Sequence, residues 1–192
     1  MKLKDLAKVM PGYAFRGAIE ADFQGDTLVL QARDISRDGF LAEVSHLTPI
    51  SRKQTGRAEV LCKNDVLLVS RGLKSGSFRA TLFMSDASNV IASSSVHILR
   101  VKTEKMLPEY LVYYLNSKGG QDALSQIVSG SYIGVLSRGR LSEELDIPLP
   151  SLRQQKLLID LVSNIRRQEE VLERQKVLRQ GIVDEVFKKI TA

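Results

Sequence analysis

The last forty residues constrain this chain most, because they have the composition of one uninterrupted helix. After the two prolines of the stretch DIPLPSLRQQKLL, no proline occurs before the C-terminus. Ser151 followed by Gln154 matches a capping box, which marks a helix start. Gly181 is the one strong helix-weakening residue in the run. About forty helical residues span roughly 60 Å. Because that length exceeds the width of an ordinary small domain, we expect the helix to pack against a partner.

A heptad pattern along this segment predicts a coiled coil over residues 151–192. The seam is apolar at its start and mixed with polar residues later. Polar seam residues lower the stability of a coiled coil but fix its register and partner orientation. The residues predicted to pair are Leu158, Leu161, Ile165, Gln168, Leu172, Gln175, Ile182 and Val186. The alternative is that the helix folds back onto its own globular domain.

Residues 1–150 have the pattern of one α+β domain. Short apolar runs bounded by turn residues predict strands at 26–35, 40–44, 66–71, 78–84 and 95–101. Helical spacing and a proline at the first turn predict helices at 3–10, 108–117 and 121–130, with Gly119 and Gly120 separating the last two. A short edge strand is predicted at 145–150. We therefore expect a mixed or antiparallel sheet with packed helices, followed by one long helix.

Basic residues gather in three windows that contain no acid. The chain carries a formal net charge of +6, and two of these windows are rich in glycine and serine. Basic side chains on small-residue loops can approach a phosphate backbone closely. Solvated surface loops are the alternative for any single window, but three windows together favour double-stranded DNA as a partner. The predicted DNA contacts are Arg52, Lys53, Arg71, Lys74, Arg79, Ser131, Arg138 and Arg140.

The sequence lacks the motifs of catalysis and of metal binding. It has two histidines, His46 and His97, and one cysteine, Cys62, so it can form no internal disulfide and no cysteine-cluster metal site. No phosphate-loop, dinucleotide-binding or zinc-protease motif occurs. We expect a non-enzymatic protein that needs no cofactor. Because no apolar run could span a membrane and the start lacks a signal peptide, we also expect a cytoplasmic location.

The residues from Tyr110 to Val162 resemble the specificity subunits of type I restriction–modification systems. The stretches that carry the resemblance are YLVYYLNS and GSYIGVLSRGRLSEELDIPLPSLRQQKLLIDLV. The matching positions of the junction are Gly130, Ser131, Leu141, Ile147, Pro148, Leu149, Pro150, Leu152 and Gln155. The blocks PGYAFR, LQARDIS and NDVLLVSRG also look like those of a target-recognition domain.

The resemblance implies a target-recognition domain over residues 1–150 and a spacer helix over residues 151–192. The familiar subunit carries two of each in one chain, so this chain resembles a half-subunit. It implies a homodimer with antiparallel spacer helices, which directs methyltransferase subunits, and restriction subunits in systems that cleave, to a bipartite palindromic site. A dimeric transcriptional regulator is the alternative, although no helix-turn-helix pattern is visible. A nuclease with acids near Asp65 is a third hypothesis, weakened because Asp65 has no partner motif.

Overall fold

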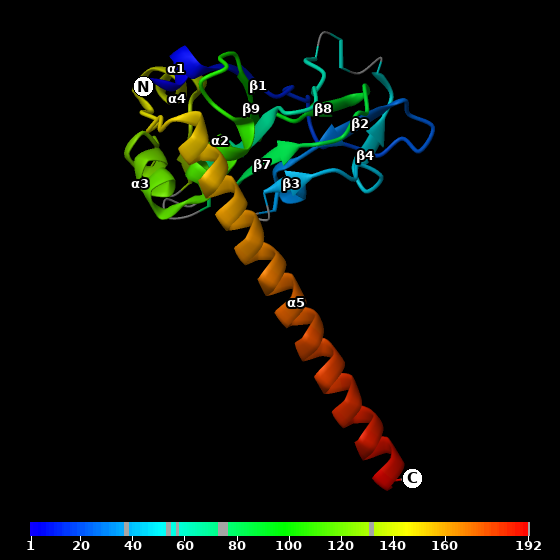
Figure 1. The fold of residues 1–192 in the computed structure, drawn as a ribbon. Helices are drawn as coiled ribbons and strands as arrows, with labels where there is room; N and C mark the ends of the chain where they lie inside the picture. Colours follow the sequence, from blue (N-terminus) through cyan, green and yellow to red (C-terminus); the bar gives the residue numbers. More distant parts are fainter. Residues whose placement is uncertain (37–38, 53–54, 57, 73–76, 131–132, 192) are drawn as a thin grey trace. The chain divides into compact units, whose positions relative to one another are not determined.

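The computed structural model describes residues 1–191 apart from 37–38, 53–54, 57, 73–76 and 131–132 (Figure 1). The chain divides into two compact units, Met1–Gln155 and Lys156–Ala192. The first unit contains the sheets and the short helices. The second unit continues a single helix, α5, which begins at Leu152 and ends at Thr191.

A five-stranded mixed sheet forms the centre of the first unit. Its order is β1-β9-β5-β7-β3. The strands are β1 Ala7–Pro11, β9 Val96–Val101, β5 Val66–Val69, β7 Ala80–Phe83 and β3 Phe40–Leu41. Neighbours are antiparallel except β3 and β7, which are parallel. Every residue of β5 is buried, as its continuous apolar sequence predicts for a strand covered on both faces.

Two smaller sheets extend this centre. One has the order β4-β2-β8 and the other is a two-stranded ribbon of β10 and β6. Their strands are β4 Thr48–Ile50, β2 Thr27–Leu30, β8 Val90–Ala92, β10 Gly134–Val135 and β6 Arg71–Gly72. β2 pairs antiparallel with β4 and parallel with β8. One core cluster joins the two larger sheets, because it contains Leu30 and Ala92 together with Leu67 and Ile98.

Short helices complete the first unit. They are α1 Leu3–Leu6, the 3-10 helix η1 Ala32–Asp34, α2 Pro108–Asn116, α3 Lys118–Gln126 and α4 Arg138–Glu144. α2 packs on β7 and α3, and α4 packs on α1 and β1. The predicted fold class is therefore confirmed: an α+β unit with a mixed sheet and packed helices, followed by one long helix.

The N-terminal helix predicted over residues 3–10 is wrong beyond Leu6. From Ala7 the chain is strand β1, which pairs with β9 in the register Ala7 with Val101 and Met10 with Ile98. Both Ala7 and Met10 are buried. Their helical spacing was therefore overridden by hydrogen bonds to a strand that lies far away in the sequence.

Two further expectations near the helices are also wrong. Gly119 and Gly120 do not separate two helices but lie inside α3, whose N-terminus is capped by the Ser117 hydroxyl accepting from the Gly120 amide at 3.1 Å. A Cβ at Gly120 would collide with the Tyr114 carbonyl, so this glycine permits the sharp turn from α2. The predicted edge strand at 145–150 is reduced to one bridge between Asp146 and Lys2.

The junction before α5 is fixed by three side chains. The Tyr110 hydroxyl donates to the Pro148 carbonyl at 2.8 Å and the Tyr114 hydroxyl to the Asp146 carbonyl at 3.2 Å. Gln155 is fully buried and accepts from the Leu107 amide at 2.9 Å. It also donates to the carbonyls of Lys105 at 2.8 Å and Pro150 at 2.9 Å. The predicted capping box is present, since the Ser151 amide donates to Gln154 at 3.0 Å and the Gln154 amide to Ser151 at 3.4 Å.

Replacing Gln155 by leucine should lower the free energy of unfolding by about 2–4 kcal/mol. The leucine side chain leaves three backbone groups unpaired, and each buried unpaired group costs about 1–3 kcal/mol before any relaxation. Urea unfolding of the full chain measures the loss. The matched control is Gln154→Leu at an exposed position. This variant removes only a helix cap, so its free energy of unfolding should fall by about 1 kcal/mol. Equal losses in the two variants would contradict the role of Gln155.

Candidate functional site

The β6–β10 ribbon brings two of the three acid-free windows together. Gly134 pairs with Gly72 and Val135 with Arg71, and the Leu136 amide donates to the Ser70 carbonyl at 2.9 Å. Neither window shows this pairing in its sequence, because the two are far apart along the chain. The ribbon therefore places the second and third predicted basic windows on one side of the first unit.

A groove of about 810 Å³ lies beside this ribbon. It is lined by Arg71 and Arg79, which were predicted, and by Arg33, which was not. The other residues that line it are Ala32, Ser36, Val69, Gly72 and Ser77. Among the described residues that line it, none is Asp or Glu. Three arginines in one lining make the groove attractive to a phosphate.

Arg79 is held in place by the backbone on both sides of it. The Asn116 amide accepts from the Ala80 N–H at 2.9 Å and donates to the Ala80 carbonyl at 2.8 Å. Gln121 donates to the Phe78 carbonyl at 2.8 Å, and the Arg79 Nη2 donates to the Ala32 carbonyl at 3.1 Å. The guanidinium is thus ordered before any ligand arrives, which lowers the entropy cost of binding.

Arg33 and Arg71 are the more exposed members of the groove. Arg33 donates from Nη2 to the Thr48 hydroxyl at 3.0 Å, and its side chain is 69% exposed. The Arg33 Nε lies 3.7 Å from Oδ1 of the neighbouring Asp34, near the outer limit of an ion pair. Arg33 was predicted inside a strand over residues 26–35, whereas β2 ends at Leu30 and Arg33 lies in η1. Nothing in the sequence linked it to the windows of Arg71 and Arg79.

The other predicted DNA contacts are not among the described residues that line this groove, or they lie outside the described residues. The Arg52 amide donates to Asp26 at 2.9 Å, which lowers the pKa of that carboxyl. Arg138 and Arg140 do not lie on a loop but begin helix α4, and Arg140 forms a two-point ion pair with Glu144 at 2.9 Å. Lys53, Lys74 and Ser131 lie outside the residues that the structure describes.

The buried ionisable groups of the first unit have structural roles. The His97 Nε2 donates to the Leu136 carbonyl at 2.6 Å, and burial lowers the pKa of His97, so the ring is neutral at pH 7. Asp65 accepts from Arg100 at 2.8 Å and from the Cys62 amide at 2.8 Å. This pairing occupies the carboxylate that the nuclease hypothesis needed. Among the described residues, no three His, Cys, Asp or Glu side chains could hold a metal ion together.

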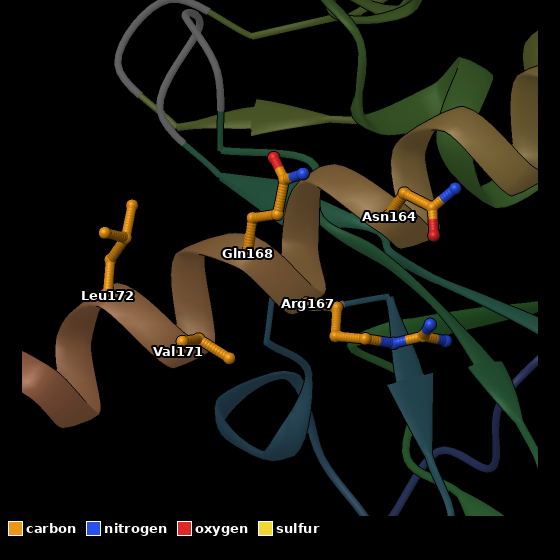
Figure 2. Close-up of a pocket in the computed structure, with 5 residues that line it drawn as sticks. All are labelled: Asn164, Arg167, Gln168, Val171 and Leu172. Carbon is orange, nitrogen blue, oxygen red and sulfur yellow. The ribbon is translucent and has the colours of Figure 1, made fainter.

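Helix α5 presents a second candidate surface. Its seam side chains are exposed in the single chain, with Leu161 at 55% and Leu172 at 63%. Figure 2 shows Gln168 and Leu172 projecting from the same side of the helix, at a hollow that Asn164, Arg167 and Val171 also line. Within the described part of the chain, no helix is long and apolar enough to cross a membrane. Exposed apolar residues at heptad spacing instead favour pairing with another helix.

Comparison with known proteins gives a consistent result. Residues 1–178 match the family described as the type I restriction modification DNA specificity domain. The chain is 24% identical over 186 residues to the type I restriction enzyme MjaIX specificity subunit of Methanocaldococcus jannaschii. That alignment covers 90% of this chain and 40% of the relative. These matches give no support to the alternative of a stand-alone transcriptional regulator.

Solved structures share the fold. A chain from a study of complex assembly and conformational transition of the type I R-M system has a TM-score of 0.66 at 18% identity, covering 96% of this chain and 42% of its own. The HsdS subunit from Thermoanaerobacter tengcongensis has a TM-score of 0.58 at 20% identity, covering 90% of this chain and 38% of its own. The chain therefore spans about two fifths of the length of these relatives.

Proposed function

Because this chain belongs to the family of type I restriction modification DNA specificity domains, we propose that it selects the DNA target of a restriction–modification complex and performs no chemistry itself. The basic groove of Arg33, Arg71 and Arg79 is the observation that carries this proposal. Phosphate contacts of this kind position a protein on duplex DNA. We assign target recognition to residues 1–150 and spacing to residues 151–192.

The exposed apolar seam of α5 supports a two-fold assembly. A second copy of the chain, related by a two-fold axis, would cover this seam and present the same recognition surface a second time. In an antiparallel pair, Leu158, Leu161 and Ile165 face Val186, Ile182 and Arg179 of the partner subunit. Gln168 then faces Gln175 of the partner subunit, and the two copies of Leu172 meet at the axis.

A rigid helix pair explains why the long helix is useful to a DNA reader. Base pairs are stacked about 3.4 Å apart, so a fixed distance between two recognition units sets a fixed number of base pairs between two half-sites. A flexible linker would allow many spacings. The proposed target is therefore an interrupted palindrome, because both half-sites are read by the same surface in opposite senses.

The proposed protein partners are the subunits that carry out the reaction. The chain would dock on methyltransferase subunits through α5 and the junction at Pro148–Pro150, and on restriction subunits in a complex that also cleaves. The exposed apolar residues of α5 support this assignment, since a helix can contact a second copy with one face and another protein with the rest.

Selection from a random library of duplex DNA by the full chain tests the proposal. The expected product is one enriched sequence made of two inverted half-sites at a fixed spacing, and co-expressed methyltransferase should methylate that same sequence. An enriched sequence without dyad symmetry would contradict the homodimer. A library that remains random after selection, with and without the methyltransferase, would contradict the proposed function.

A further inference from the structure

The outer face of the β6–β10 ribbon carries two exposed apolar side chains. Ile133 is 57% exposed and Val135 is 37% exposed, whereas Gly134 between them is buried. Ile133 directly precedes β10 and Val135 lies in it, so the two exposed side chains flank the buried Gly134. Together they form a small apolar contact point on the surface of the ribbon.

The inward face of the ribbon fixes its position. A Cβ at Gly134 would approach the Val128 Cγ1 to 2.5 Å and the Gly72 carbonyl oxygen to 3.2 Å. The Ser129 and Val135 backbones exchange two hydrogen bonds, at 3.1 and 2.8 Å. At Leu136, the next residue, the backbone amide donates a hydrogen bond to the Ser70 carbonyl and the carbonyl accepts one from the His97 ring. The ribbon therefore presents Ile133 and Val135 on a supported backbone.

A positive charge stands beside this apolar pair. Val135 is directly opposite Arg71 in the ribbon, and cross-strand partners lie on the same face of a sheet. Arg71 also lines the groove that contains Arg33 and Arg79. The surface thus combines an apolar contact with neighbouring sites for phosphate, which fits a polyanion that offers an apolar group at a fixed position.

We propose that the outward face of the ribbon enters the major groove of the target DNA, where Ile133 and Val135 contact the C5 methyl group of a thymine. The major groove is wide enough for a two-stranded ribbon, and the thymine methyl is the apolar group on its floor. Uracil in RNA has no such methyl group. This inference rests on the proposed function and names one base contact within it.

Duplexes that contain deoxyuridine in place of thymine test the contact directly. Each thymine of one half-site of the selected DNA sequence is replaced in turn, which removes the methyl group and leaves base pairing intact. Binding of the full chain should weaken about fourfold at one of these positions, the equivalent of one buried methyl group. In the variant Ile133→Ala/Val135→Ala, the same replacement should change binding by less than about 1.5-fold, because the methyl group has lost its contacts.

A matched control separates this contact from general loss of apolar surface. Phe23 is 91% exposed and lies between Asp22 and Asp26, where acidic neighbours disfavour DNA. The variant Phe23→Ala should retain the fourfold deoxyuridine effect, and thermal unfolding should show that all variants are folded. A deoxyuridine effect that persists in Ile133→Ala/Val135→Ala would overturn the inference, as would a selected site with no methyl-sensitive thymine. Failure to enrich any sequence would instead overturn the proposed function.

Discussion

Replacing Arg33, Arg71 and Arg79 together by glutamine should remove most of the salt-dependent affinity of this chain for duplex DNA. Each phosphate contact releases counterions, so three lost contacts per chain should reduce the slope of log affinity against log salt by about 2.7 units. Between 50 and 200 mM salt, the native chain should then lose about 40-fold more affinity than the variant. Fluorescence anisotropy titrations at several salt concentrations measure both slopes.

The matched control for this prediction removes the same charge elsewhere. Arg52, Arg138 and Arg140 were also predicted to contact DNA, but they do not line the groove. The variant with all three replaced by glutamine should keep a slope close to that of the native chain, because the Arg140 charge is already paired with Glu144. If the slope of log affinity against log salt falls equally in the two triple variants, the DNA contacts are spread over the surface and are not centred on the groove.

Replacing Leu161 and Leu172 by glutamate should convert a dimer into a monomer. Light scattering of the native chain at micromolar concentration should give about twice the 21.4 kDa chain mass. In the proposed antiparallel pair, the two copies of Leu172 meet at the two-fold axis, so glutamates there would place like charges together in an apolar seam. Leu161→Glu adds a second buried charge opposite Ile182 of the partner subunit. The variant should elute and scatter as a single chain.

Val177→Glu is the control for this change. Val177 is 64% exposed, nearly the same as Leu172 at 63%, but it lies at the heptad position farthest from the seam. A glutamate there should leave the dimer intact. If Val177→Glu dissociates the dimer as well, or if Leu161→Glu/Leu172→Glu remains dimeric, the predicted seam is wrong. Point variants are preferable to truncation after Pro150, because truncation also removes Gln155, whose hydrogen bonds fix the junction.

The sequence alone determined the helices whose hydrogen bonds are local and the strand whose composition reflects complete burial. Helix α5 required only a capping box at Ser151 and Gln154 and the absence of proline after Pro150. Strand β5 could be predicted from four consecutive apolar residues, and α2 from the proline in its first turn. The helices form their backbone hydrogen bonds within a few residues, so local signals are sufficient for them. β5 pairs with the distant strands β7 and β9, and it could be predicted because a strand buried on both faces is apolar throughout.

Only the tertiary structure decided how distant segments meet. Residues 7–10 have helical spacing, yet they form β1 because β9 offers backbone partners. Arg33, Arg71 and Arg79 line one groove because η1, β6 and the residue that precedes β7 converge there, and Gln155 finds partners near α2. These contacts depend on hydrogen bonds and packing between segments far apart in the chain, and such contacts leave no periodic signal in either segment.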